Sequence, residues 1–200
     1  MKQYSITIFI IILVAVSTPS MMAQKKIKNI PPKKQTKHAN VLSRGFGTML
    51  EFSDSKNLRV GEKVQFGVHL DATYCVDMNL GESFMPPLPP PGGGDIRFVN
   101  PRGQDSCMDL GISNDFRPFT SIAQIDTYKV SLQPDTLGFP VTVRWTPLKK
   151  YYGGQVTLSD PFKGRIITVD MKKDTSATIK EEIPFIIIIA QKPFNPQKKK

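Results

Sequence analysis

Apolar and polar residues alternate along most of the chain beyond residue 44, with the two-residue period of strands that bury one face. In residues 64–71, four apolar side chains fall on one face, and His69 falls on the other face with glutamine, glycine and aspartate. This segment therefore predicts a strand with one core face and an exposed His69. Helical periodicity is convincing nowhere in the sequence.

The same alternation predicts about nine short strands, separated by Gly, Pro, Asn and Asp residues that favour turns. Strands spaced so closely leave no room for the helical crossovers of a parallel sheet, so an antiparallel arrangement is favoured. We therefore expect an all-β fold, an antiparallel immunoglobulin-like β-sandwich. The predicted strands are 46–52, 64–70, 95–100, 127–132, 141–145, 155–158, 165–171, 175–180 and 183–190.

Two apolar features belong to this predicted sandwich. Trp145, the single tryptophan, falls on an inward position of its strand and is expected in the core. The run Ile186–Ile189 has no polar interruption, which indicates a strand covered on both faces. Because such a run would favour aggregation if exposed, we expect it either in the core or at an edge that a partner covers.

The N-terminal residues match an export signal. Lys2 precedes an apolar run, residues 6–16, that is typical of the hydrophobic region of a signal peptide. The run is too short for a transmembrane helix, which needs roughly 20 apolar residues. Cleavage is expected after Ala23, so residues 1–23 are assigned to a signal peptide, with no transmembrane segment after cleavage. The protein is then expected in the periplasm, on the outer surface or outside the cell.

Positive charge is concentrated at both ends of the remaining chain, and the formal net charge is +10 at pH 7. Residues 24–40 contain six lysines and few apolar residues, which predicts a disordered Lys-rich linker. We expect one sandwich domain over residues 41–191 and a basic tail over residues 192–200. The lysines suit anionic envelope polymers or lipid headgroups. No aromatic residues accompany them to stack bases, so no nucleic-acid partner is expected.

The two cysteines, Cys75 and Cys107, are expected to form a disulfide, because an exported chain meets an oxidising compartment. The bond would close a loop of ~30 residues. Inside that loop, Pro86–Pro91 and Gly92–Gly94 predict a stiff polyproline segment followed by a flexible one. This segment is either a spacer between strands or a proline-rich ligand for an aromatic groove.

No group of residues in the sequence matches a catalytic or metal site. His38 falls in the predicted linker and His69 on a predicted exposed face, so neither has an evident nucleophile or base beside it. Asp71 and Asp77 flank Cys75 without the spacing of a calcium loop or a zinc site. We therefore expect no enzyme activity, no metal and no cofactor.

Leu80–Glu82, followed by Pro86–Pro90 and Asp95–Phe98, resembles a segment of secreted proteins from Bacteroidetes-like and Ignavibacteria-like bacteria. The resemblance implies a β-sandwich near the C-terminus of larger exported chains, which are often substrates of type IX secretion. It carries over no catalytic residues. Further segments resemble the same module in the same order, so that roughly residues 80–191 are covered: Gly138–Trp145, Tyr151–Gly154, Leu158–Phe162 and Val169–Met171.

These observations favour a non-catalytic structural or adhesive module, secreted or in the cell envelope, whose partners are envelope or extracellular proteins or polysaccharides. A glycan-binding module of the cell surface is the alternative. In that alternative, aromatic residues such as Tyr74, Tyr151 and Tyr152 stack on sugar rings, and the Tyr151–Tyr152 pair beside Gly153 and Gly154 is the feature to test. An aromatic pair beside a turn also packs locally in many proteins, so the sequence leaves both interpretations open.

Overall fold

The computed structural model of the chain describes residues 44–56, 58–100, 107 and 110–196. All of them belong to the second of two compact units, which spans Lys37–Lys200. The predicted signal peptide (1–23), the predicted linker (24–40) and the last four residues of the predicted basic tail lie outside the described residues. Within the described ranges, no helix is long and apolar enough to cross a bilayer.

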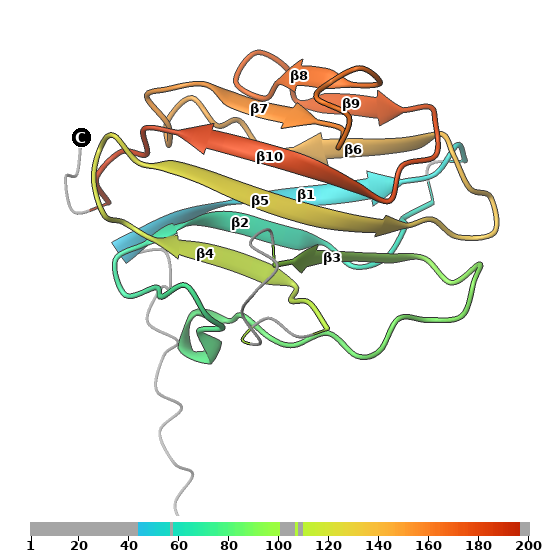
Figure 1. Ribbon diagram of the computed structural model, residues 1–200, viewed down its shortest axis with the longest axis horizontal. Coiled ribbons are helices and arrows are strands. Elements are labelled where there is room, and N and C mark those ends of the chain that lie inside the picture. Colours follow the sequence, from blue (N-terminus) through green and yellow to red (C-terminus); the bar gives the residue numbers. More distant parts are fainter. Residues whose placement is uncertain (1–43, 57, 101–106, 108–109, 197–200) are drawn as a thin grey trace, which may run out of the picture. The chain divides into compact units, whose positions relative to one another are not determined.

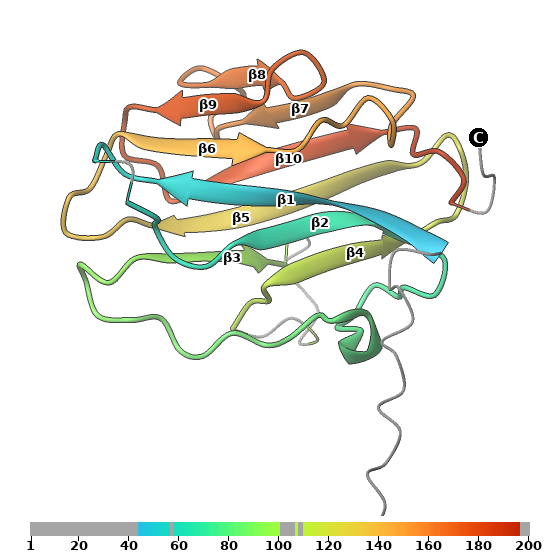
Figure 2. The ribbon, with the colours of Figure 1, turned by 180° about the vertical axis from the view of Figure 1, so that it is seen from behind.

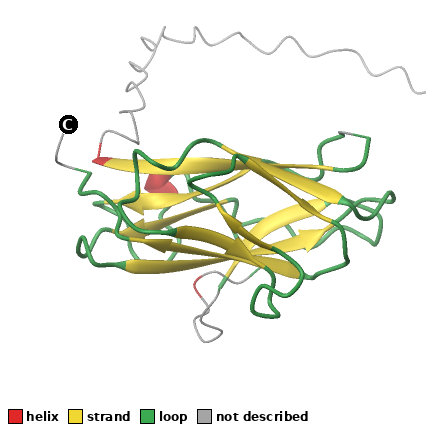
Figure 3. Cartoon of the chain, turned by 90° about the horizontal axis from the view of Figure 1, so that it is seen from above, coloured by secondary structure: helices red, strands yellow, loops and turns green. Residues whose placement is uncertain are grey.

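The described residues form two five-stranded sheets that face each other as two layers (Figures 1, 2 and 3). The first sheet has the order β4-β2-β1-β6-β9 and the second the order β3-β5-β10-β7-β8. All neighbours are antiparallel except β2 and β4, which run parallel. The strands are β1 (Gly45–Ser53), β2 (Val64–His69), β3 (Asp95–Val99), β4 (Asn114–Pro118), β5 (Ile125–Gln133), β6 (Val141–Trp145), β7 (Val156–Ser159), β8 (Thr168–Asp170), β9 (Ser176–Ile179) and β10 (Phe185–Gln191).

The predicted fold class, an antiparallel β-sandwich, is confirmed. Each of the nine predicted segments contains a strand, and the structure adds a tenth, β4, which the alternation does not reveal. In β4 the side chains of Asp115 and Arg117 are buried, and the guanidinium of Arg117 lies 5.4 Å from the ring centroid of the core residue Tyr128. Because charged residues occupy interior positions of this strand, its sequence lacks the apolar alternation of a half-buried strand.

The core lies between the two sheets and includes the predicted positions. Trp145 is buried, and its indole Nε1 donates hydrogen bonds to the carbonyls of Met171 and Asp174, both at 2.9 Å. This confirms Trp145 as a core residue. The isoleucine run lies in β10, between β5 and β7 in the middle of the second sheet, with Ile186 and Ile188 fully buried. The run therefore lies within the sandwich and not at an edge, but Ile187 and Ile189 on the outer face are only half-buried, so the predicted cover on both faces is wrong.

One side of the sandwich is closed by a segment that passes from one sheet to the other. Ile112 exchanges two backbone hydrogen bonds with Phe98 of β3, each 2.9 Å long, and the chain then enters the first sheet as β4. The residues before β3 run along the same side, at the bottom of Figure 1. The opposite side, at the top of Figure 1, ends in β8 and β9.

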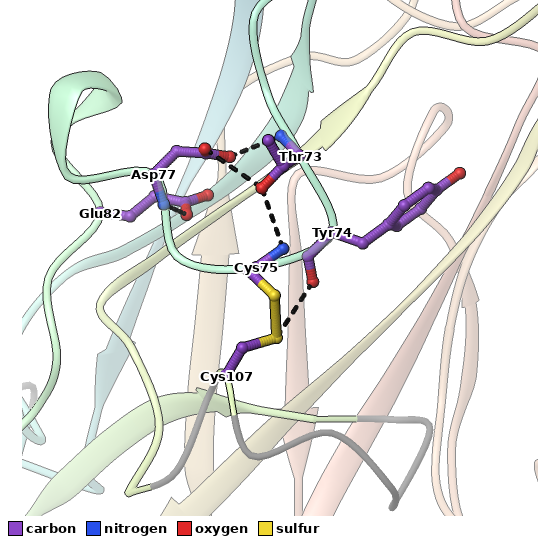
Figure 4. Close-up of a disulfide and its surroundings, with 6 residues drawn as sticks. All are labelled: Thr73, Tyr74, Cys75, Asp77, Glu82 and Cys107. Atoms are coloured by element: carbon purple, nitrogen blue, oxygen red, sulfur yellow. Dashed lines mark hydrogen bonds between the residues drawn. A yellow bond between two sulfur atoms is a disulfide. The ribbon is translucent and has the colours of Figure 1, made fainter.

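The predicted disulfide is confirmed. Cys75 and Cys107 are bonded, with their Cα atoms 5.2 Å apart and a sequence separation of 32 (Figure 4). The neighbouring turn is tied to itself: the carboxylate of Asp77 accepts hydrogen bonds from the backbone N–H (2.6 Å) and hydroxyl (3.2 Å) of Thr73. The bond therefore anchors an ordered turn rather than a loose loop.

The predicted exposure of His69 is wrong. The residue is 3% exposed, because Phe116 of the unpredicted strand β4 packs edge-to-face against the imidazole, with ring centroids 6.5 Å apart. The chain also turns back over it, and the backbone N–H of Asp71 donates to Nδ1 at 3.1 Å. Gly45 lies opposite His69 in β1, where a β-carbon would collide with the ring. The alternation of residues within β2 cannot reveal that residues outside this strand bury His69.

Removing the disulfide with the double substitution Cys75→Ala and Cys107→Ala is expected to lower the free energy of unfolding by about 3 kcal/mol, because the unfolded chain regains the freedom of a closed loop. Urea unfolding of the non-reduced proteins measures the difference. Wild-type protein in reductant serves as the control and should approach the variant. Two alkylatable thiols in non-reduced wild-type protein would contradict the assignment.

Candidate functional site

An open, mainly apolar pocket of about 520 Å³ lies at one end of the sandwich. Its walls come from the start of β1, the β4–β5 and β6–β7 connections and the residues after β10, segments that lie far apart in the sequence. Apolar concave sites with a few polar groups are the usual places for ligands. The lining residues are Gly45, Phe46, Ile122, Lys150, Tyr151, Phe194, Asn195 and Pro196.

Tyr151 is the central aromatic residue of this pocket. Its ring stacks on Phe46 with a centroid separation of 4.8 Å and an interplanar angle of 7°. The Nζ of Lys150 lies 4.7 Å from the Tyr151 centroid, within the range of a cation–π interaction. The structure thus places one of the two predicted stacking residues, Tyr151, in an open pocket and fixes the orientation of its ring.

Tyr152 does not share this position, which corrects the prediction that it stacks on a ligand. It is 1% exposed, and its ring packs edge-to-face against Phe46 at 5.3 Å. Burial raises the pKa of its hydroxyl far above the ordinary value. Tyr152 pairs with Pro193 as in a short β-bridge, and neighbouring residues in such a bridge point to opposite sides. Tyr152 therefore belongs to the core, and Tyr151 belongs to the pocket.

The first residues of the predicted basic tail belong to the fold and to the pocket. Lys192 donates its backbone N–H to the carbonyl of Gln124 at 2.8 Å, and Phe194 donates its N–H to the carbonyl of Tyr151 at 2.8 Å. Charge composition suggested a solvated tail from residue 192 onward. The structure instead pairs Lys192 with Gln124 and uses residues 194–196 to build one wall of the pocket, and Phe194 is a site residue that the sequence analysis missed.

The polyproline segment is tied down at several points. Gln133 donates from Nε2 to the carbonyls of Pro89 (3.0 Å), Pro90 (3.2 Å) and Gly93 (2.9 Å). These contacts support its interpretation as a spacer between strands. A free proline-rich ligand would keep its carbonyls available to solvent and to a partner.

The buried ion pair of Asp95 and Arg97 holds the chain segments before and after β3. The guanidinium donates to both carboxylate oxygens of Asp95, each at 2.6 Å, and to the carbonyls of Pro86 (2.8 Å) and Leu110 (2.6 Å). The bonds to Pro86 and Leu110 join β3 to the segments before and after it, and Asp95 in the same strand holds the guanidinium in place. The pair therefore has a structural role, and it is far from the lining of the pocket in sequence.

Glu82 is a buried carboxyl group that links the turn beside Cys75, which contains Asp77, to β4. It accepts the backbone N–H groups of Asp77 and Phe116, each at 2.6 Å (Figure 4 shows the first). Burial raises its pKa from 4.5 to about 7, and the two backbone hydrogen bonds oppose this only in part. The sequence analysis gave Glu82 no role, and its isolated position in the sequence carries no signal of one.

In the described part of the chain, no three His, Cys, Asp or Glu side chains gather in a way that would hold a metal ion. No family model matches the chain, and neither the curated proteins nor the solved structures contain a match to it. The class that the fold itself defines is an all-β, two-sheet sandwich with one disulfide.

The raised pKa of Glu82 predicts a dependence of stability on pH. The protonated carboxyl stabilises the fold fully below pH 4.5, and this contribution, at most about 3 kcal/mol, is lost as the pH rises through 7. Urea unfolding at a series of pH values should show the decline in wild type and not in Glu82→Gln. The exposed Glu62→Gln serves as the control and should follow wild type. Parallel curves for wild type and Glu82→Gln would refute the assignment.

Proposed function

We propose that this protein is a non-catalytic module, secreted or in the cell envelope, that attaches to envelope or extracellular material through the pocket around Tyr151. The observation that carries the proposal is the aromatic ring of Tyr151, held by Phe46 and Lys150 in the lining of an open apolar pocket. Rigid aromatic anchors in pockets contribute most of the binding energy in many interfaces.

Further observations support export to an oxidising compartment and a non-catalytic role. The export signal predicted at the N-terminus and the disulfide both fit an oxidising compartment. The buried Asp95–Arg97 pair and the buried Glu82 are occupied by contacts within the fold. A catalytic carboxyl group needs reach to a substrate, which these groups do not have.

A glycan ligand is the second candidate, and one observation favours it. The pocket combines aromatic rings, Tyr151 and Phe194, with the polar groups of Lys150 and Asn195. Aromatic faces stack on sugar rings while amide and ammonium groups bond to hydroxyls. Since Tyr152 is buried, this candidate depends on Tyr151 instead of on a pair of tyrosines.

The first test is a pull-down of envelope material with the protein starting at Gln24 and with a version starting at Asn40, each at low salt and at about 1 M salt. Charge attraction is screened over about 3 Å at that salt concentration, whereas contacts in an apolar pocket persist. We expect binding to survive both removal of residues 24–39 and high salt. Loss of binding on removal of residues 24–39 would make their lysines the anchor and the sandwich a spacer, whereas loss at high salt alone would show that charge, and not the apolar pocket, carries the binding.

The pocket itself is tested by Tyr151→Ala, which is expected to weaken binding about tenfold because it removes the central anchor. Tyr74→Ala removes a half-exposed tyrosine elsewhere in the described residues and serves as the matched control. The same two variants on immobilised cell-surface polysaccharide distinguish a glycan ligand from a protein. Equal retention of Tyr151→Ala and Tyr74→Ala on every material would exclude the pocket as the binding site.

A further inference from the structure

The loop between β7 and β8, residues 160–167, is organised by one buried carboxylate. Asp160 is 1% exposed, and its Oδ1 accepts the backbone N–H groups of Phe162 (2.6 Å) and Gly164 (3.3 Å). Its Oδ2 accepts those of Ile166 (2.7 Å) and Ile167 (2.8 Å). Burial alone would raise the pKa of Asp160, but the four backbone hydrogen bonds lower it below the ordinary value.

The loop holds a backbone conformation that a free chain rarely adopts. Lys163 and Gly164 both have positive φ angles, 63° and 76°. For a lysine this left-handed conformation is unfavourable, so it persists only where surrounding contacts enforce it. Asp160 supplies those contacts, and the hydroxyl of Thr168 adds a hydrogen bond to the carbonyl of Gly164 at 3.2 Å. The loop is therefore rigid before any partner binds.

The rigid loop exposes an aromatic side chain that is followed closely in sequence by two cations. Phe162 is 49% exposed, and Lys163 and Arg165 are exposed beside it. The only carboxylate within the loop is that of Asp160, which is turned inward. The loop lies with β7 and β8 at the top of Figure 1, on the side away from the disulfide-bounded segment.

We propose that this loop binds an anionic lipid surface, with Phe162 entering the headgroup region and Lys163 and Arg165 contacting lipid phosphates. A lipid surface offers apolar volume and negative charge together, which is the combination that the loop presents. A phenylalanine has no polar atom, and the loop exposes no carboxylate to bond sugar hydroxyls, so an acidic polysaccharide fits less well. The inference rests on the envelope location proposed above and names a partner for it.

Rigidity makes so small a surface effective. Binding through a flexible loop would first have to order several residues, and that entropy would offset the few contacts made. Here Asp160 has already fixed the loop, so its three exposed side chains meet the surface in one arrangement. The attraction of the two cations extends only over the Debye length, and we therefore expect binding to be sensitive to salt.

The test is co-sedimentation with vesicles of phosphatidylglycerol mixed with phosphatidylcholine, and with vesicles of phosphatidylcholine alone. The protein starting at Asn40 is used, so that the lysines of residues 24–39 do not contribute. We expect binding to the anionic vesicles only. Phe162→Ser should weaken it about fivefold, and the double variant Lys163→Asn, Arg165→Gln on the order of tenfold. Asparagine is chosen because it tolerates a positive φ.

A matched double variant, Lys56→Gln with Lys180→Gln, removes the same charge from exposed positions outside the loop. It should bind much more tightly than the loop double variant, and equal losses would overturn the proposal. So would unchanged binding of Phe162→Ser, or a stronger and Phe162-dependent retention on alginate, which would identify an acidic polysaccharide as the partner. Thermal unfolding of each variant confirms that the sandwich is intact.

Asp160→Asn provides a test in which loop rigidity and net charge act in opposite directions. The substitution makes the protein more positive, so simple charge attraction would increase binding to anionic vesicles. It also replaces one acceptor oxygen with an amide, which loosens the loop, and we therefore expect weaker binding. Increased binding would overturn the proposal. Vesicle binding can fail while the envelope pull-down through Tyr151 succeeds, and the reverse also holds, so the two proposals are tested separately.

Discussion

The covered side of the sandwich depends on the buried guanidinium of Arg97. Strand pairing holds β3 to β5, but the polyproline segment before β3 and the residues leading into β4 have no regular place in either sheet. Arg97 joins them, because it bonds the carboxylate of Asp95 and the carbonyls of Pro86 and Leu110 at once. Removing one partner of a buried ion pair typically costs about 3–5 kcal/mol. A lysine, with three donors at one point, could not span the same acceptors.

Buried acidic groups also hold irregular segments in place elsewhere in the sandwich. Glu82 and Asp160 are each aimed at backbone N–H groups, so that turns without regular hydrogen bonding keep a fixed shape. The turn fixed by Asp160 leaves Phe162 and two basic side chains exposed, and the pocket around Tyr151 is built from other connections. The buried polar groups thus hold the turns in shape, and the proposed binding surfaces lie on the connections between strands.

The sequence predicted the fold well because most strands bury one face, and alternation records that directly. It also predicted the disulfide and the core position of Trp145, since composition and strand register determine both. The sequence-based predictions failed where the burial of a residue depends on other strands. The charged residues of β4 point inward, and His69 is covered by Phe116. The pocket was only half predicted, because Phe46, Tyr151 and Phe194 meet through the packing of distant loops, which no local pattern encodes.

The closed side has a consequence for how copies of the chain can associate. At the β4 edge, Ser113 donates its backbone N–H to the carbonyl of Ser83, and the N–H of Phe116 bonds Glu82, so an incoming strand finds these groups taken. The sheets end at β8 and β9 on the opposite side. Growth of a fibre by edge-to-edge pairing needs an acceptor edge at both sides of every unit. A strand added beside β9 would therefore find no matching free edge at β4, which hinders the continuous growth of this sheet from one copy to the next.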